Sequence, residues 1–111
     1  IVSSKRKRRT DMPIFSLTLH RTYYNQGFFN VTVDFDRFVR PQEGPIVLRL
    51  GLRGPETQGI VDRRANRNGT PRIIGGAKLR DWFQKNYKLM EIVAVDLSSP
   101  EIIILHEPSD E

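Results

Sequence analysis

Apolar and polar residues alternate along much of the chain, in the pattern of strands that bury one face. The first such segment carries apolar side chains at every second position: Phe15, Leu17 and Leu19. The alternation restarts after Gly27, which lets the chain turn, and indicates strands at 29–33, 46–50, about 58–64 and 72–74. A Ser-Ser-Pro-Glu turn separates two apolar runs near the end and predicts a hairpin of 92–97 with 102–105.

Helical spacing is present in two places. Leu79, Trp82 and Phe83 fall at positions i, i+3 and i+4 after a Gly-Gly pair, which predicts a helix whose apolar face packs on the core. A second, short helix is expected over 34–40. Residues 20–27, between the first two strands, are polar and aromatic, and we expect them to form an arm-like loop.

The order of these elements predicts a mainly β fold, a seven-stranded open pseudobarrel with one or two short helices. A chain of 111 residues fits one domain, which we expect over 14–107. A basic linker or arm is expected over 1–13 and an acidic tail over 108–111. Because the sequence begins with Ile1 rather than methionine, we expect it to lie inside a longer gene product.

Charge is distributed unevenly along the chain. The net charge is +5, and residues 5–9 alone supply five positive charges, so the rest of the chain is balanced. Residues 49–80 contain eight basic and two acidic residues, whereas 90–111 contain six acidic residues and neither lysine nor arginine. This distribution favours a polyanion as the partner of the middle of the chain.

The sequence lacks the residues that several kinds of catalytic chemistry require. It contains no cysteine, which excludes disulfides, thiolate nucleophiles and cysteine-bound zinc. Neither an acidic residue nor His20 or His106 is followed two positions later by lysine, as certain metal-dependent and phospholipase-D-like nucleases require. Asp34 and Asp36 fit helix caps better than metal ligands. No apolar run approaches the roughly 20 residues that span a membrane, so we expect a binding domain without catalytic site, metal, cofactor or membrane span.

The most informative segment is 62–72, which places four arginines and two asparagines between two strands. Arginine can bind both major-groove acceptors of guanine, asparagine can bind adenine, and both side chains also bind phosphate. A basic hairpin that is merely exposed is the alternative interpretation. The candidate DNA-binding residues here are Arg63, Arg64, Asn66, Arg67, Asn68, Thr70 and Arg72, with Lys78 in the following helix.

The segment between the first two strands is a second candidate surface. Its side chains can donate or accept hydrogen bonds, and the candidate DNA-binding residues are His20, Arg21, Tyr23, Asn25 and Gln26. In the alternative interpretation, the tyrosines of this segment only cover the core.

With these elements in place, residues from about 15 to 105 resemble the B3-type DNA-binding pseudobarrel of plant transcription factors and of restriction-endonuclease target-recognition domains. The restriction-enzyme branch looks closer. The resemblance rests on 19–31 (LHRTYYNQGFFNV), on 46–50 (IVLRL), and on the order of arm, Gly-Gly, helix with Trp82-Phe83, and Leu89 before Ile92. The family often has Gly-Asp before its penultimate strand, where this chain has Met-Glu.

The resemblance implies that two arms, here 20–26 and 63–72, hold the major groove of double-stranded DNA. It also implies a covalently linked nuclease domain elsewhere in the polypeptide, and the cytoplasm of a bacterium as the location. The fragment itself would select the site and the linked domain would cut. The alternatives are a protein-interaction module that docks a sister domain or subunit through the acidic hairpin or the basic arm, and, more weakly, an RNA-binding barrel.

Overall fold

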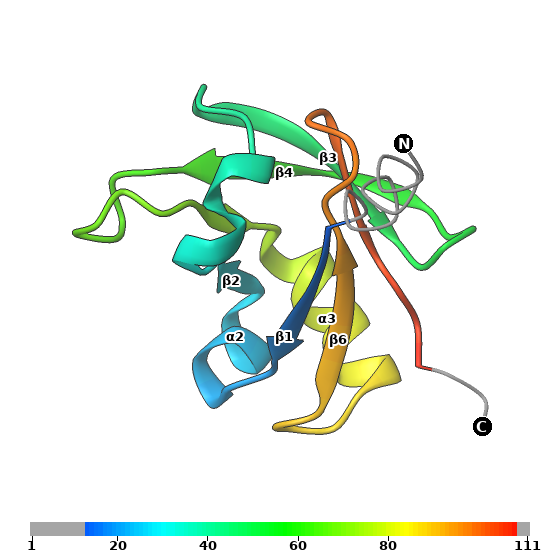
Figure 1. Ribbon diagram of the computed structural model, residues 1–111. Helices are drawn as coiled ribbons and strands as arrows, with labels where there is room; N and C mark the ends of the chain where they lie inside the picture. Colours follow the sequence, from blue (N-terminus) through cyan, green and yellow to red (C-terminus); the bar gives the residue numbers. More distant parts are fainter. Residues whose placement is uncertain (1–12, 109–111) are drawn as a thin grey trace, which may run out of the picture.

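The computed structural model describes residues 13–108, and its seven strands form one sheet (Figure 1). The order of strands across the sheet is β1-β6-β7-β3-β4-β5-β2. The strands are β1 (Ile14–Thr18), β2 (Phe28–Asn30), β3 (Gly44–Leu50), β4 (Glu56–Asp62), β5 (Arg72–Ile74), β6 (Ile92–Asp96) and β7 (Ile102–Leu105). The helices are α2 (Arg21–Gln26), the 3₁₀ helix η1 (Val33–Phe38) and α3 (Gly76–Asn86).

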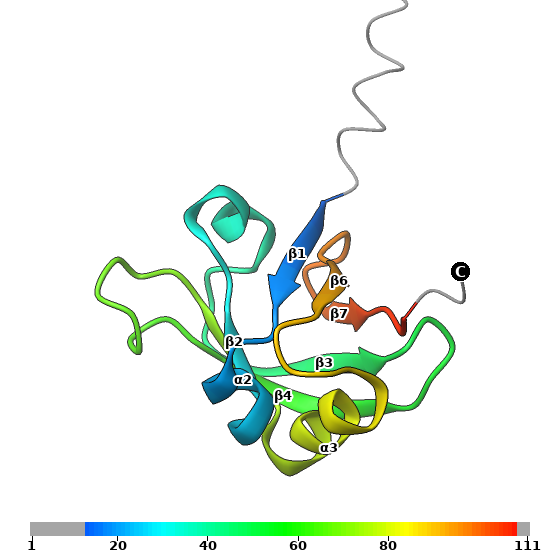
Figure 2. The same cartoon turned by 90° about the horizontal axis from the view of Figure 1, so that it is seen from below.

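The sheet is mixed and curls into a nearly closed barrel (Figure 2). Its neighbouring strands are antiparallel except β3 and β7, which run parallel with Val47 opposite Ile102 and Leu50 opposite Leu105. The two strands at the ends of the order, β1 and β2, are not paired with each other, so a seam between them stays unsealed. The expected mainly β, seven-stranded open barrel is confirmed.

The core forms inside the barrel because alternate residues of each strand point to the same face. The predicted inward residues Phe15, Leu17 and Leu19 are buried, as are Val93 and Val95 of the strand paired with β1. On β3 the buried positions are likewise every second one: Ile46, Leu48 and Leu50. The hydrophobic pattern of the first strand therefore predicted its buried face correctly.

Helix α3 closes one end of this core, as its spacing predicted. Leu79 and Phe83 are fully buried, while Trp82 is half-buried and meets the Tyr87 ring edge-on at 5.8 Å. The helix ends at Asn86 and is capped by Tyr87, whose N–H donates to the Phe83 carbonyl at 2.8 Å. Its beginning is attached to the end of α2, because the N–H groups of Gly75 and Gly76 both donate to the Gly27 carbonyl at 2.9 Å.

The expected arm-like loop at 20–27 is wrong, because most of this segment is the helix α2. Gly27 ends the helix in the left-handed conformation, and its N–H donates to the Tyr23 carbonyl. A helix of six residues is too short to be stable alone. It is stabilised by α3 and the segment after it: the Tyr24 hydroxyl donates to the Tyr87 carbonyl at 2.8 Å, and the Gln84 amide donates to the Tyr24 carbonyl at 2.9 Å.

The boundaries of three other predicted elements differ from the structure. The second strand ends at Asn30, so Val33 is not a strand residue and is exposed at the start of η1. The short helix expected over 34–40 exists, but it is a 3₁₀ helix, Val33–Phe38. The fourth strand runs over Glu56–Asp62 and ends before Arg63.

Two further expectations concern the ends of the chain and membrane insertion. The basic arm expected over 1–13 and the acidic tail over 108–111 lie outside the described residues, apart from Pro13 and Pro108. Within 13–108, no helix is long and apolar enough to cross a membrane.

Replacing Gly27 by alanine is expected to destabilise the fold more than replacing Gly69, although both glycines have φ of +79°. A Cβ at Gly27 would lie 2.1 Å from the Gly76 carbonyl oxygen, whereas a Cβ at Gly69 meets nothing within 4 Å. Gly69→Ala should lower the free energy of unfolding by about 1–2 kcal/mol, the cost of left-handed backbone in an L-residue. Gly27→Ala should lower it by roughly 1–3 kcal/mol more, as overpacking does. Urea unfolding of both variants tests this, and equal losses would contradict it.

Candidate functional site

Parts of the two predicted arms meet at the end of β2. There they line a groove of about 570 Å³, with Tyr23 contributed by α2 and residues 30–33 by the chain that leaves β2. The loop between β4 and β5, residues 63–71, supplies Asn66, Arg67, Asn68 and Thr70. We call 63–71 the arginine loop. Figures 1 and 2 both show it projecting away from the barrel.

The asparagines of the arginine loop are used to shape it. The Asn66 amide donates to the Asn30 Oδ1 at 3.0 Å and to the Thr70 carbonyl at 3.1 Å. The Asn68 Oδ1 accepts from the backbone N–H of Thr70 at 3.2 Å and from its hydroxyl at 2.7 Å. Thr70 is only 6% exposed. Asn66 and Thr70, predicted as DNA contacts, are therefore structural residues of the loop, whereas the exposed Asn68 still presents its amide nitrogen.

Arg63, also predicted as a DNA contact, is directed into the protein. Its side chain is 18% exposed, and its guanidinium forms an ion pair with Asp36 of η1 at 2.5 Å. The same guanidinium donates to the carbonyls of Val39, Arg40 and Gly69 at 2.8 to 3.3 Å. Because all of its nitrogens donate within the chain, Arg63 connects the arginine loop to η1 and is not available for a ligand.

Three other predicted cations remain exposed. The Arg64 side chain is 88% exposed and lies 3.6 Å from the Glu43 carboxylate, a separation at which a surface ion pair contributes little. Arg67 is exposed and has no ion-pair partner among the described residues. Lys78 is exposed in the first turn of α3. These side chains place exposed positive charge on the arginine loop and at the start of α3.

Arg72, the first residue of β5, is held differently from the other arginines. Its Nε donates to the Asn30 Oδ1 at 3.0 Å, and its guanidinium carbon lies 4.4 Å from the centre of the Phe28 ring. Its two Nη atoms have no hydrogen-bond partner among residues 13–108. The guanidinium is therefore held by Asn30 at its Nε edge and by the Phe28 ring on one face, while its two Nη atoms remain available.

On α2 and the residue before it, four of the five predicted side chains are exposed: His20, Arg21, Asn25 and Gln26. The fifth, Tyr23, is half-buried and meets the rings of Phe28 at 5.5 Å and His20 at 5.8 Å, both edge-on. Tyr24 also packs against the core, where its hydroxyl donates to the Tyr87 carbonyl, and this contact fits both interpretations of the segment. The segment combines an exposed polar surface with an inward aromatic side.

Sequence reasoning missed the residues that position the candidate side chains. Asn30, Phe28 and Asp36 hold Arg72, Asn66 and Arg63, yet nothing in their local sequence indicates this, because their partners are 27 to 44 residues away. The one available signal was Asp36, which the sequence suggested as a cap of the short helix. The structure gives its carboxylate to Arg63 instead.

The pKa shifts lie away from the arginine loop, at Tyr87 after α3 and at Glu107 after β7. Burial raises the pKa of the Tyr87 hydroxyl, and the nearby carboxylates of Glu107 and Glu91 raise it further. The pKa of Glu107 is lowered mainly because its carboxylate accepts a hydrogen bond from the Leu52 N–H at 2.9 Å. Among the described residues, no group of three or more histidine or acidic side chains is placed to hold a metal ion.

Comparison with models of protein families, with curated proteins and with solved structures found no match for this chain.

Replacing Arg63 by alanine should lower the free energy of unfolding by roughly 1–3 kcal/mol, because several backbone carbonyls and the Asp36 carboxylate lose a charged donor. Arg64→Ala is the matched control, a neighbouring arginine that is almost fully exposed, and it should change stability by no more than about 0.5 kcal/mol. Urea denaturation measures both. Equal stability of the two variants would show that Arg63 does not hold the loop.

Acidification should weaken the attachment of the C-terminal segment to the β3–β4 turn. The lowered pKa of Glu107 means that its ionised form stabilises the fold, so this contribution is present above the ordinary glutamate pKa and is lost as pH falls through the lowered one. Glu107→Gln should therefore be less stable than the unchanged protein at neutral pH. Its stability should also fall less as the pH is lowered. Thermal melts from pH 7 to pH 3 test this, and parallel curves for both proteins would contradict it.

Proposed function

We propose that this chain recognises a specific sequence in double-stranded DNA by placing α2 and the arginine loop in the major groove. The observation that carries the proposal is the groove at the end of β2, where Tyr23 of α2 and Asn66–Asn68 of the loop line one surface. Both segments also carry exposed hydrogen-bond donors, such as Arg21 and Gln26 on α2 and Arg67 on the loop. Major-groove edges of base pairs present acceptors and donors that such side chains can bind.

The dimensions and charge of these segments suit a duplex. The major groove of DNA is about 12 Å wide and admits a helix or a two-stranded ribbon. The arginine loop is the tip of the β4–β5 ribbon, and it projects from the barrel (Figure 2). Arg64, Arg67 and Lys78 are exposed cations that can neutralise phosphates on either side of the groove.

In the fuller form of this proposal, the chain is the target-recognition domain of a restriction endonuclease, and a covalently linked nuclease domain cuts the DNA. Its support is the sequence resemblance to the B3-type pseudobarrel, whose two arms coincide in order with α2 and the arginine loop. The chain then contributes site selection and no catalytic residue. A bacterial cytoplasm is the location that this form of the proposal implies.

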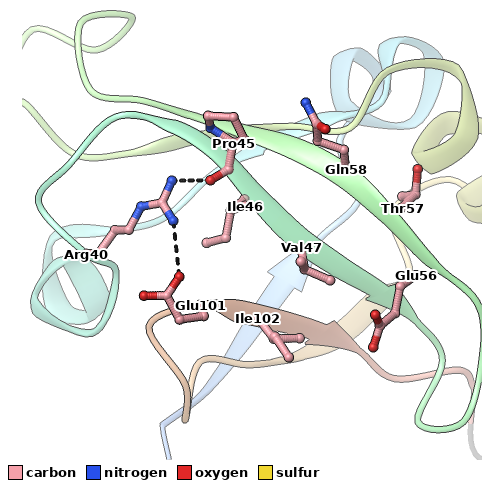
Figure 3. A pocket seen from close by; sticks show the side chains of 9 residues that line it. All are labelled: Arg40, Pro45, Ile46, Val47, Glu56, Thr57, Gln58, Glu101 and Ile102. Carbon is pink, nitrogen blue, oxygen red and sulfur yellow. Dashed lines mark hydrogen bonds and ion pairs between the residues drawn. The ribbon is translucent and has the colours of Figure 1, made fainter.

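Docking of a sister domain or subunit is a second candidate function, and one observation favours it. The outer surface of β3, β4 and β7 carries a pocket of about 500 Å³ with the apolar side chains of Val47 and Ile102 in its floor (Figure 3). Arg40 lies at its border, where it donates to the Pro45 carbonyl and pairs with Glu101 at 3.6 Å. An apolar floor with a charged border is typical of an interface that excludes water at its centre.

Arg67→Ala should weaken binding to every duplex about equally and reduce the slope of log affinity against log salt concentration by about 1, as loss of one phosphate contact does. The duplexes come from selection of a randomised pool at moderate salt, followed by sequencing of the retained fraction. Arg53→Ala is the matched control, an exposed arginine in the turn at the opposite end of β4 (Figure 1). It should leave affinity and salt slope unchanged.

The selection itself distinguishes the candidate functions. A short enriched sequence supports specific recognition, and retention without enrichment means binding by charge alone. No retention, together with a DNA-independent complex formed with the linked domain, favours docking. An equal loss of affinity in Arg67→Ala and Arg53→Ala would contradict the assignment of the interface to the arginine loop.

A further inference from the structure

The contacts of Arg72 follow from the register of the sheet. Asn30 of β2 is the direct partner of Arg72 on β5, so their side chains stand on the same face. Phe28 lies two residues before Asn30 and therefore shares this face. The guanidinium extends diagonally over the Phe28 ring at 4.4 Å, while its Nε donates to the Asn30 Oδ1. The pairing of the two strands thus brings Asn30 and Phe28 to the side chain of Arg72, and these two residues fix the orientation of its guanidinium.

Asn30 also positions the arginine loop. Its Oδ1 accepts a second hydrogen bond from the Asn66 amide, and Asn66 in turn donates to the Thr70 carbonyl. One amide oxygen therefore sets both the direction of Arg72 and the position of the loop that follows β4. On the other side of Arg72, its β4 partner Asp62 forms no ion pair with it and instead accepts from the Arg64 N–H at 2.8 Å.

The contrast with Arg64 and Arg67 separates two roles. Bidentate recognition of guanine requires a guanidinium plane in one orientation, and a side chain that is already ordered loses less conformational entropy on binding. Phosphate binding is tolerant of orientation and suits exposed, unconstrained arginines. Arg72 has a fixed plane and two free Nη atoms, whereas Arg64 and Arg67 are exposed.

We propose that Arg72 reads a guanine in the major groove through its two Nη atoms, and that Asn30 and Phe28 are positioning residues that hold its guanidinium for this contact. Arg64 and Arg67 hold phosphates. This inference rests on the proposed function and assigns one specificity-determining residue within it.

The test uses a duplex that carries the selected sequence, with each guanine replaced in turn by 7-deazaguanine. This base pairs normally but lacks the N7 acceptor. At one guanine, the replacement should weaken binding of the unchanged protein at least about fivefold, because it removes half of a bidentate contact. Arg72→Ala should bind the two duplexes with equal affinity. Arg67→Ala, the control, should bind both more weakly and keep their ratio.

Asn30 is tested by the same ratio of affinities for the guanine and 7-deazaguanine duplexes. A residue with a purely structural role would not change this ratio at a single base. Asn30→Ala should lower the discrimination at the guanine read by Arg72, and Asn30→Asp should restore it, since an aspartate retains an oxygen acceptor for the Arg72 Nε. Melting temperatures of all variants confirm that the proteins compared are folded. Arg72→Lys, which keeps the charge but not the fork of donors, is a second variant that should also lose the discrimination.

The outcomes separate failure of the inference from failure of the proposed function. Suppose that a sequence is enriched, and that Arg72→Ala and Arg72→Lys still lose affinity at every guanine at which 7-deazaguanine weakens binding of the unchanged protein. This result would overturn the assignment of Arg72 and leave sequence-specific recognition intact. Loss of discrimination in Arg67→Ala instead would transfer the role to that residue and overturn the inference as well. Absence of any enriched sequence overturns both.

Discussion

The carbonyl oxygen of Gly27 accepts hydrogen bonds from the N–H groups of Gly75 and Gly76, and both helices at this end of the barrel depend on that contact. Gly27 ends α2 in the left-handed conformation, and Gly76 begins α3 with a positive φ as well. A side chain at Gly27 would separate the two chain segments, because its Cβ would lie 2.1 Å from the carbonyl oxygen of Gly76. With the helix ends joined, Leu79 and Phe83 enter the core and α2 packs against α3.

The same contact places the edge of the sheet that carries the candidate interface. Directly beyond Gly27, Phe28 pairs with Ile74 and Asn30 pairs with Arg72. A shift of this register by one residue would move these side chains to the other face of the sheet. The positions of Tyr23 on one side and of Asn66 on the other then follow from their contacts with Phe28 and Asn30. The candidate interface is therefore built outward from a backbone contact rather than from the loops themselves.

The sequence predicted the strands and helices that are recognisable from local hydrophobic periodicity. It did not predict elements whose structure depends on contacts with distant residues. The strand of Phe15, Leu17 and Leu19 and the helix of Leu79 and Phe83 were recognisable because each buries one face. Helix α2 was not, since its six residues are polar or aromatic without helical spacing and are stabilised by contacts with residues 60 or more positions away.

Arg63 and Arg67 show the same limit within the candidate site. Both are arginines of one basic segment, and their sequence surroundings do not distinguish them. Asp36 and the carbonyls of Val39 and Arg40, all more than 20 residues earlier, bind the guanidinium of Arg63. No described residue forms an ion pair with Arg67. The composition of the segment indicated a cationic surface, but only the fold divides its arginines between structure and solvent.

This division bears on why the exposed arginines are present. A loop that projects from a barrel must satisfy its own backbone groups, and in the arginine loop Arg63, Asn66 and Asn68 do so. Arg64 and Arg67 are not needed for that purpose, and exposed charges of this kind contribute little to stability. Folding therefore does not account for these two exposed arginines, whereas the proposed binding to DNA would give both of them a role.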